Sequence, residues 1–284
     1  MNSGAAPPPR VALLGAGRLG EALVVRLLAA GHPGDLVQAT VRTSEQAARL
    51  AAAHPIAVHL DTARAVRDAE VVILTVRPEH ADAVLAEALP RLRPGTAVVS
   101  FVAGRPLADL TAGSAGDVGA FRVATNAVAV ERRGLLALSA APHVGQVQAR
   151  RVRLLLSRLG EVVDVPESAQ DVAAATLGSA AAFLACAAGG VLDAAGAAGV
   201  DRRTAVAFTA DALRSAALIL ERAPSGAAAW DTLATPGGIT AAGLATMTGN
   251  RVPQSLAEAV ETAVARAVEM APDALPTAPP SPWA

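Results

Sequence analysis

The sequence predicts a doubly wound α/β sheet followed by an all-helical region, and three observations carry this prediction. Short apolar runs alternate with amphipathic stretches over residues 11–165. The pattern Gly15-Ala16-Gly17-Arg18-Leu19-Gly20 directly follows the first apolar run. After about residue 166 the strand-like runs cease, and apolar side chains recur at helical spacing. Alternation of this kind is typical of a parallel sheet with helices on both faces.

The apolar runs place the expected strands at 11–14, 37–41, 56–58, 70–76, 97–102, 118–123, 135–139 and 162–165. The run Val71-Val72-Ile73-Leu74 has no polar residue, as a parallel strand buried on both faces requires. Helices are expected between them at 18–30, 44–53, 62–68, 79–89, 106–111 and 144–159. In the second half, the apolar spacing predicts helices at 168–188, 190–198, 202–222, 236–248 and 254–270. Asp201 is the expected cap of the third.

Composition divides the chain into four parts. Residues 1–9 hold three prolines and residues 272–284 hold five, so both are expected to be disordered tails. A nucleotide-binding domain is expected at 10–165 and a helical domain at 166–271. The helical part is rich in Ala and Gly and has few charges, so we expect it to pack against a second copy of itself, as a dimerisation domain.

Charge and cysteine content exclude several classes of partner. The net charge of −1 gives no electrostatic case for nucleic acid or an anionic membrane. The single cysteine, Cys186, excludes a disulfide framework and a cysteine metal cluster, and we expect it in the core of a cytoplasmic protein. No metal site is predicted. Residues 172–192 carry no charge and are long enough to span a bilayer, but their Ala and Gly content favours burial in a protein interface. Residues 1–10 lack the apolar core of a signal peptide.

The glycine pattern predicts a dinucleotide site. The first glycine permits a tight turn, the second lets the backbone approach a pyrophosphate, and the third allows the helix to pack closely on the strand. The free amides of the following helix then face the phosphates. The strand before and the helix after this loop make a nicotinamide or flavin nucleotide the expected cofactor.

The end of the second strand indicates which nucleotide binds. A chain selective for NAD usually places Asp or Glu on the ribose hydroxyls at this point. This chain has Arg42-Thr43-Ser44, which suits a 2′-phosphate, so we expect NADPH, with NADH as the second possibility. The alternative interpretation is that Arg42 is a solvated loop residue and that Ser44 caps the next helix.

Two residue types are absent from the sequence, and this favours one reaction. The chain has no lysine and no tyrosine, and its five histidines all lie at or before residue 143. A carbonyl reductase must protonate the developing alkoxide, commonly from Tyr, Lys or His. An iminium nitrogen is already protonated before a hydride arrives. The absent acids therefore point to reduction of a C=N bond.

The stretch Thr235-Pro236-Gly237-Gly238-Ile239-Thr240 predicts a substrate loop. Thr235 suits the cap of a helix and Pro236 its first position. Two glycines leave the terminal amides open to an anion such as a carboxylate. Thr240 lies one turn into the helix, where its hydroxyl would reach a nitrogen beside that carboxylate. The alternative is an ordinary Pro-Gly helix start.

This loop, continued as Ala241-Ala242-Gly243-Leu244, resembles the signature SPGGTT-x-AGL of the pyrroline-5-carboxylate reductase family. The resemblance extends in order over residues 10–270. It includes the glycine loop, the stretch Leu74–Pro78, which is similar to LAVKP, and the pair Ala103-Gly104. It also includes Arg122–Asn126, which is similar to RVMPN, and the run from Asp171 to Ser179.

The resemblance implies a Rossmann domain, a helical dimerisation domain, and reduction of 1-pyrroline-5-carboxylate to proline, with the active site between the domains and shared across a homodimer or higher homo-oligomer. It implies a catalytic role for Thr240. The substrate residues that it implies are Thr235, Gly237, Gly238, Ile239, Ser179 and Glu221, although Glu221 also fits an exposed helix end. The cofactor residues are Gly15, Ala16, Gly17, Arg18, Leu19, Gly20, Arg42, Thr43, Ser44, Thr62, Val76, Arg77, Pro78, Ala103, Gly104 and Asn126.

Several positions depart from the family pattern. Both prolines of RVMPNTPA are absent from Arg122–Ala129, Ile239 replaces a threonine, and Thr62 replaces an asparagine that contacts adenosine. These changes favour either a diverged proline enzyme or a relative acting on another cyclic imine in a specialised pathway. Two further classes stay open: a carbonyl dehydrogenase of the hydroxyacid or prephenate type, with His80, Glu or Asp as acid, and a non-catalytic NADPH-binding dimer.

Overall fold

The computed structural model describes residues 7–114, 117–222 and 233–270. Its internal contacts divide the chain into two compact units. The first unit contains the residues up to Gly178 together with those from Val264 onward, and the second contains Ser179–Ala263. The division therefore lies about a dozen residues after the boundary at 165 that composition indicates.

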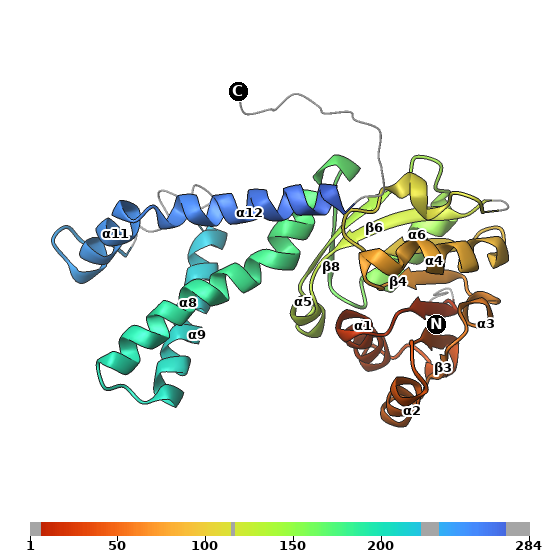
Figure 1. Ribbon diagram of the computed structural model, residues 1–284, viewed down its shortest axis with the longest axis horizontal. Coiled ribbons are helices and arrows are strands. Elements are labelled where there is room, and N and C mark those ends of the chain that lie inside the picture. Colours follow the sequence, from red (N-terminus) through yellow and green to blue (C-terminus); the bar gives the residue numbers. More distant parts are fainter. Residues whose placement is uncertain (1–6, 115–116, 223–232, 271–284) are drawn as a thin grey trace, which may run out of the picture. The chain divides into compact units, whose positions relative to one another are not determined.

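The first unit is built on one eight-stranded sheet (Figure 1). The strand order is β3-β2-β1-β4-β5-β6-β7-β8. The strands are β1 (Val11–Leu14), β2 (Val37–Thr40), β3 (Ala57–His59), β4 (Val71–Leu74), β5 (Ala97–Ser100), β6 (Gly119–Ala124), β7 (Leu135–Ala140) and β8 (Glu161–Asp164). The first six are parallel, β7 pairs antiparallel with β6, and β8 runs parallel with β7. The doubly wound prediction is confirmed, with a reversed pair of strands at one edge.

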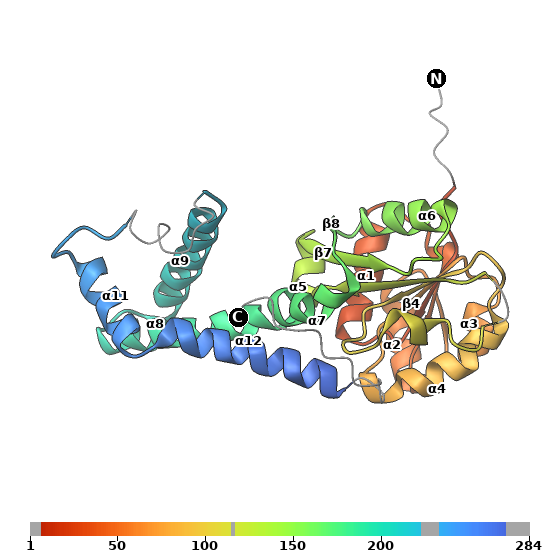
Figure 2. The same ribbon diagram turned by 90° about the horizontal axis from the view of Figure 1, so that it is seen from above.

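Helices cover both faces of this sheet. They are α1 (Arg18–Ala29), α2 (Ser44–Ala53), α3 (Thr62–Val66), α4 (Pro78–Ala88), α5 (Ala127–Glu131) and α6 (Gln146–Leu156). Alternate residues of β1 serve the two cores: Leu13 packs with Leu23 of α1 and Val152 of α6, whereas Leu14 packs with residues of α3 and α4. In Figure 2 the strands lie between α6 and α4.

One expected helix of the first unit has a different form. Residues 106–111 contain only a 3₁₀ helix, Leu107–Leu110, after the turn residue Pro106. Because Leu107 and Leu110 are both buried against the sheet, this short turn fills the space that a helix occupies elsewhere. The prediction of an α-helix over 106–111 is therefore wrong, since only a single 3₁₀ turn forms there.

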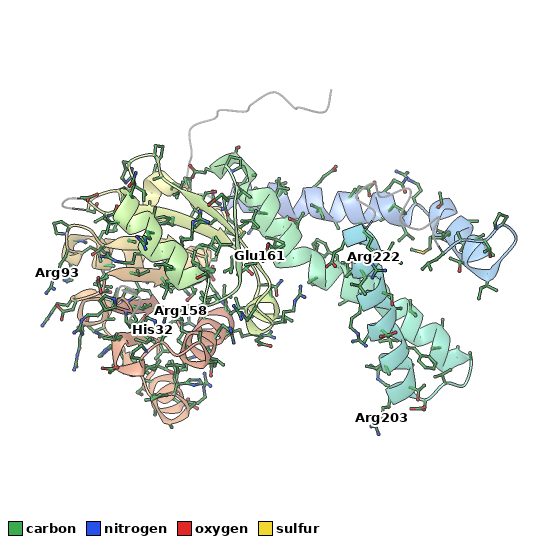
Figure 3. All side chains as sticks on the ribbon, turned by 180° about the vertical axis from the view of Figure 1, so that it is seen from behind. His32, Arg93, Arg158, Glu161, Arg203 and Arg222 are labelled. Carbon is green, nitrogen blue, oxygen red and sulfur yellow. The ribbon has the colours of Figure 1, made fainter. Side chains whose placement is uncertain are left out.

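The second half is helical throughout its described part. It contains α7 (Gln170–Ala173), α8 (Ala180–Ala197), α9 (Arg202–Arg222), α11 (Ile239–Gly249) and α12 (Val252–Glu269). In Figure 1, α8 and α9 lie side by side as an antiparallel pair, and Figure 3 labels Arg203 and Arg222 at the two ends of α9. Asp201 caps α9 as predicted, since its Oδ1 accepts a hydrogen bond of 3.1 Å from the Thr204 amide.

The sequence predicts that one helix ends at residue 188 and the next begins at residue 190, and this break is wrong. Gly189 and Gly190 lie inside α8, and the irregularity falls earlier, in a π-helical turn at Ala174–Ser179. A Cβ at either glycine would meet no atom within 4 Å, so these glycines mark open space beside the helix rather than its end. Cys186 also differs from the expectation, because it is exposed in the single chain instead of lying in a core.

The helical unit leaves large apolar side chains exposed. Examples are Leu184, Val191, Phe208 and Leu220, each about half exposed or more. The segment Glu167–Ala197 is long and apolar enough to cross a bilayer by length and composition, and only 6% of its most apolar window is buried in the single chain. Such surface requires a covering partner if it is to leave water.

A buried polar cluster fastens the start of the helical half to the sheet. Arg122 of β6 is buried, and its Nη2 lies 2.7 Å from Oδ1 of Asp171. Gln170 is also buried, and its side-chain nitrogen lies within hydrogen-bond distance of the carbonyl oxygens of Arg122 and Ala137. These contacts fix α7 against β6 and β7.

Replacement of Asp171 by asparagine is expected to lower the free energy of unfolding by about 1–3 kcal/mol, because the Arg122 charge loses its nearest counter-charge while it stays buried. Asp164→Asn is the matched control, because its partner Arg153 is on the surface and such pairs are worth less than about 1 kcal/mol. Urea unfolding followed by circular dichroism compares the two. Equal losses would contradict a special role for the buried pair.

Candidate functional site

The strand order reverses at β1, so the carboxyl ends of β1 and β4 form the topological switch point of the sheet. From β1 the chain continues to β2 and β3 on one side, then returns to β4 on the other side. Ligands of open α/β sheets bind at such a point. The glycine loop follows β1, and Thr75-Val76-Arg77 follows β4. The two loops therefore share this edge.

The three glycines of the loop have different environments. Gly15 has a φ of +91°, and a Cβ there would lie 2.5 Å from Cγ1 of Val76. A Cβ on Gly20 would lie 2.7 Å from the carbonyl oxygen of Gly15. At Gly17 a Cβ would meet no atom within 4 Å. Two glycines thus allow the turn and the packing of α1, and the third faces open space where a phosphate group would approach.

Two threonines hold this loop in place. Oγ1 of Thr40 accepts a hydrogen bond of 3.1 Å from the Gly15 amide, and Oγ1 of Thr75 donates one of 2.8 Å to the Gly15 carbonyl oxygen. Neither threonine is among the predicted site residues. Their positions in the sequence, at the end of β2 and directly after β4, are the pattern that could have indicated them.

The amino end of α1 is open and free of uncompensated negative charge. Gly17 is the N-cap and has no side chain to bond the first amides. Glu21 lies in the first turn, where a carboxylate would repel a phosphate, but Arg49 binds it through two hydrogen bonds of 2.9 and 2.7 Å. Hydrogen bonding to Arg49 lowers the pKa of Glu21 below its usual value, with His54 contributing in the same direction. The dipole of α1 therefore remains available to an anion.

The three predicted cofactor residues that follow β2 have different positions and contacts. Thr43 is the N-cap of α2, since its Oγ1 accepts a hydrogen bond of 3.2 Å from the Gln46 amide. Ser44 is the first residue of the helix, so the expected alternative of Ser44 as cap is wrong. The exposed side chain of Arg42 reaches His80 of α4, with Nη1 and Nε2 3.3 Å apart.

The remaining predicted cofactor residues lie at the carboxyl ends of the other strands. Arg77 is the N-cap of α4 and Pro78 its first residue. Gly104 has a φ of +70° in the turn after β5. Thr62 is buried at the start of α3, which Asp61 caps. The other members of the predicted set, Ala16, Arg18, Leu19, Val76 and Ala103, lie in the same loops or at the start of α1.

Asn126 uses its side chain within the protein. Its Oδ1 accepts a hydrogen bond of 2.8 Å from the Ala129 amide as N-cap of α5, and its Nδ2 donates one of 2.5 Å to the carbonyl oxygen of Leu177. Leu177 lies in the π-helical turn. Asn126 therefore positions the end of β6 against this turn, a role that sequence similarity does not indicate.

All five histidines belong to the first unit. His32 is buried beside Arg158, with Nδ1 and the arginine Nη1 3.5 Å apart (Figure 3). Burial lowers the pKa of His32, and Arg158 lowers it further. His54 contacts Glu21, His59 contacts Gln38, and His143 contacts the carbonyl oxygen of Val118. With His80, which contacts Arg42, each histidine thus has a partner within the first unit.

The predicted substrate loop forms a turn before its helix. The Gly238 amide donates a hydrogen bond of 2.9 Å to the Thr235 carbonyl oxygen, and Gly237 has a φ of +73°. With Pro236 at the second position and Gly237 at the third, this is a type II β-turn. A Cβ on Gly238 would lie 2.4 Å from Oγ1 of Thr235, so the threonine side chain packs on the glycine.

The helix starts later than the sequence predicts. It begins at Ile239, with Gly238 as N-cap, so Pro236 is a turn residue and Thr235 is not the cap. No side chain caps this helix, and its first intrahelical bond runs from the Ala242 amide to the Gly238 carbonyl oxygen. The amides of Ile239, Thr240 and Ala241 are therefore open donors. Because the N-cap residue Gly238 has no side chain, no capping hydroxyl occupies these amides, and an anion can bind them.

The predicted catalytic residue Thr240 and three other predicted substrate residues lie in the second unit. Ile239 is 94% exposed, and Thr240 is exposed beside it. Ser179 ends the π-helical turn directly before α8. Glu221 is exposed near the end of α9, before residues 223–232, which lie outside the described part of the chain. Within that part, no three His, Cys, Asp or Glu side chains gather to hold a metal ion.

Comparison with known proteins supports the two-part organisation. A family model described as NADP oxidoreductase, coenzyme F420-dependent, matches residues 10–104, and one described as pyrroline-5-carboxylate reductase dimerisation matches residues 167–270. Pyrroline-5-carboxylate reductase of Pseudomonas aeruginosa is 31% identical over 265 residues, covering 93% of this chain and 97% of that protein.

Two solved structures share the fold. Plasmodium falciparum pyrroline carboxylate reductase with NADP bound has a TM-score of 0.82 at 18% identity and covers 94% of this chain and 99% of that one. The enzyme of Streptococcus pyogenes has a TM-score of 0.83 at 21% identity, covering 93% and 100%. Fold and loop geometry define a Rossmann-type oxidoreductase with a helical second part. The chain belongs to the pyrroline-5-carboxylate reductase family.

Proposed function

We propose that this protein reduces 1-pyrroline-5-carboxylate to proline with NADPH. The observation that carries this proposal is the open amino end of α11, where three consecutive amides have no partner in the helix and no capping side chain. Its relative in Pseudomonas aeruginosa bears the name of that activity, at 31% identity over nearly the whole of both chains.

The chain fits a dinucleotide at the β1 and β4 loops. The open space at Gly17 admits a pyrophosphate, and the uncapped start of α1 supplies amide donors to it. Arg42, Thr43 and Ser44 serve the adenosine end, with Thr62 beside them. Val76, Arg77, Pro78, Ala103, Gly104 and Asn126 serve the nicotinamide side. When bound, NADPH supplies the hydride.

The second unit binds the substrate. The amides at 239–241 hold its carboxylate, helped by the positive end of the α11 dipole. Gly237 and Gly238 keep the approach free of side chains, and Thr235 packs against Gly238 to hold the turn. The hydroxyl of Thr240 bonds the ring nitrogen and fixes the face of the C=N bond. Ser179 and Glu221 complete the substrate set.

The bond changes need no side-chain acid. The ring nitrogen enters protonated, the hydride forms a new C–H bond at the imine carbon, and the π electron pair moves to nitrogen. This balance agrees with a chain that has no lysine and no tyrosine. The protein supplies position and electrostatic stabilisation.

The helical part, residues 166–271 in our division, is the dimerisation domain, and 10–165 binds the nucleotide. The match of residues 167–270 to the family's dimerisation model supports this assignment, as does the exposed apolar surface of α8 and α9. We assign the protein to the cytoplasm as a homodimer or higher homo-oligomer, with the apolar segment 167–197 covered by the second copy.

A second candidate is a related cyclic imine. Ile239 stands almost fully exposed beside the open amides, at a position where the family pattern has threonine. An apolar side chain there favours a larger or less polar ring. No contact of the described residues favours a carbonyl dehydrogenase, and the open helix start argues against a protein that only binds NADPH.

The test is NADPH consumption by the full-length protein with a panel of imines. The panel contains 1-pyrroline-5-carboxylate, the piperideine carboxylates and uncharged cyclic imines. We expect oxidation with a carboxylated ring and little with rings that lack the acid group, because the carboxylate binds the α11 amides. No oxidation with any of them would contradict imine reduction, and faster reaction of uncharged rings would contradict the carboxylate site.

A further inference from the structure

We propose that His80 joins Arg42 in binding the 2′-phosphate of NADPH and so contributes to the choice between NADPH and NADH. The proposal rests on the proposed use of NADPH. The observation behind it is a contact between two side chains that both donate to anions, with Nη1 of Arg42 3.3 Å from Nε2 of His80.

The two residues reach each other across the nucleotide loop. Arg42 follows β2, His80 lies in the first turn of α4, which follows β4, and β1 lies between these strands. The glycine loop begins at the end of β1. In a sheet of this order the pyrophosphate lies on that loop and the adenosine ribose points toward β2. The pair therefore stands where the ribose hydroxyls and any phosphate on them would be.

The chemistry of the pair favours an anion between its members. A guanidinium has only donors, so the His80 nitrogen must act as acceptor in the observed contact. In the parts of the chain that the structure describes, neither side chain forms an ion pair with a carboxylate. The neighbouring Glu79 instead lies 4.0 Å from Arg77. A bound phosphate would replace this contact: it would accept a hydrogen bond from Arg42 and one from an N–H of His80, whose ring would carry its proton on the nitrogen that faces the phosphate.

The other groups at this edge explain why His80 is needed. The Thr43 hydroxyl is already used to cap α2, so it has less to offer a phosphate than its position suggests. Ser44 and the first amides of α2 stand next to Arg42. His80 supplies a donor from the opposite side, which no residue of the β2 loop can do. A phosphate held from two sides is positioned as well as attracted.

The experiment compares two fragments of the cofactor by calorimetry on the full-length protein. Adenosine 2′,5′-bisphosphate carries the distinguishing phosphate, and 5′-AMP lacks it. We expect the wild type to bind the bisphosphate more tightly, and His80→Ala to weaken that binding about fivefold with little change for 5′-AMP. His80→Arg, which restores a donor, should recover most of the loss.

His143→Ala is the matched control, because among the described residues that ring forms a hydrogen bond with the Val118 carbonyl oxygen, so its loss should change neither affinity. Equal weakening for both fragments would mean that His80 contacts adenosine rather than phosphate, and would overturn the proposal. So would an unchanged affinity in His80→Ala, or a wild type that does not prefer the bisphosphate. No imine is present, so these results are independent of whether the protein reduces one.

Discussion

Thr240→Ala is expected to lower kcat for 1-pyrroline-5-carboxylate by about tenfold to a hundredfold, because a hydrogen bond to a charged group is worth about 1.5–3 kcal/mol. In the proposed site, the hydroxyl that is removed bonds the substrate nitrogen from the first turn of α11. NADPH affinity should not change, since Thr240 is not among the residues proposed to bind the nucleotide. Steady-state kinetics and fluorescence titration with NADPH measure the two quantities.

Two variants of the same helix make this test specific. Thr240→Ser keeps the hydroxyl and should retain most of the wild-type rate. Thr246→Ala removes a hydroxyl that bonds the Ala242 carbonyl oxygen within α11, at 3.3 Å, and should leave the rate almost unchanged. If Thr240→Ala turned over as fast as wild type, or no slower than Thr246→Ala, Thr240 would have no role in the mechanism.

Gly17→Ala is expected to weaken NADPH binding by about tenfold or more while the protein stays folded. A Cβ at Gly17 meets no protein atom within 4 Å, so the fold tolerates it. It would stand where the backbone must approach the pyrophosphate, and lost amide bonds to a charged group cost about 1.5–3 kcal/mol each. Calorimetric titration with NADPH measures the affinity.

Gly20→Ala is the contrasting variant in the same loop. Its Cβ would lie 2.7 Å from the Gly15 carbonyl oxygen and 2.9 Å from the Thr75 hydroxyl, so the strand and α1 must separate. We expect a loss of about 1–3 kcal/mol in the free energy of unfolding. Gly17→Ala should cost less than about 1 kcal/mol. The reverse ranking in thermal unfolding would show that the two glycines have been assigned the wrong roles.

The sheet was the most predictable part of the chain. All eight strands occur within a few residues of their expected positions, because most of them contain short apolar stretches, such as those of β1, β4 and β5. A run such as Val71–Leu74 has no alternative as an amphipathic helix. The reversal of β7 and β8 could not be predicted in this way, since the apolar pattern of a strand does not record its direction.

The helical half was predicted in type and less well in its boundaries. Gly189 and Gly190 suggest a helix end, yet both lie inside α8. The π-helical turn at 174–179 contains no glycine or proline before Gly178, so the sequence pattern does not indicate it. The start of α11 was placed three residues early, because a Pro-Gly pair fits both a helix start and a type II turn. The hydrogen bond from Gly238 to Thr235 selects the turn.

The candidate site was predictable where backbone geometry demands a residue type. Gly15 is required by its positive φ and Gly20 by the close packing of α1 on the loop, and both glycines belong to a known sequence motif. Thr40, Thr75 and His80 act through contacts between segments far apart in the chain, which no local pattern carries. Asn126 was found by similarity, but its bond to Leu177 became apparent only in the fold.

The most direct test of the central claim is a crystal structure of the protein with NADP⁺ and L-proline. The account predicts that the proline carboxylate accepts hydrogen bonds of about 2.7–3.2 Å from the amides of Ile239, Thr240 and Ala241, with the Thr240 hydroxyl on the ring nitrogen. A carboxylate bound elsewhere, with the start of α11 facing only solvent, would contradict it.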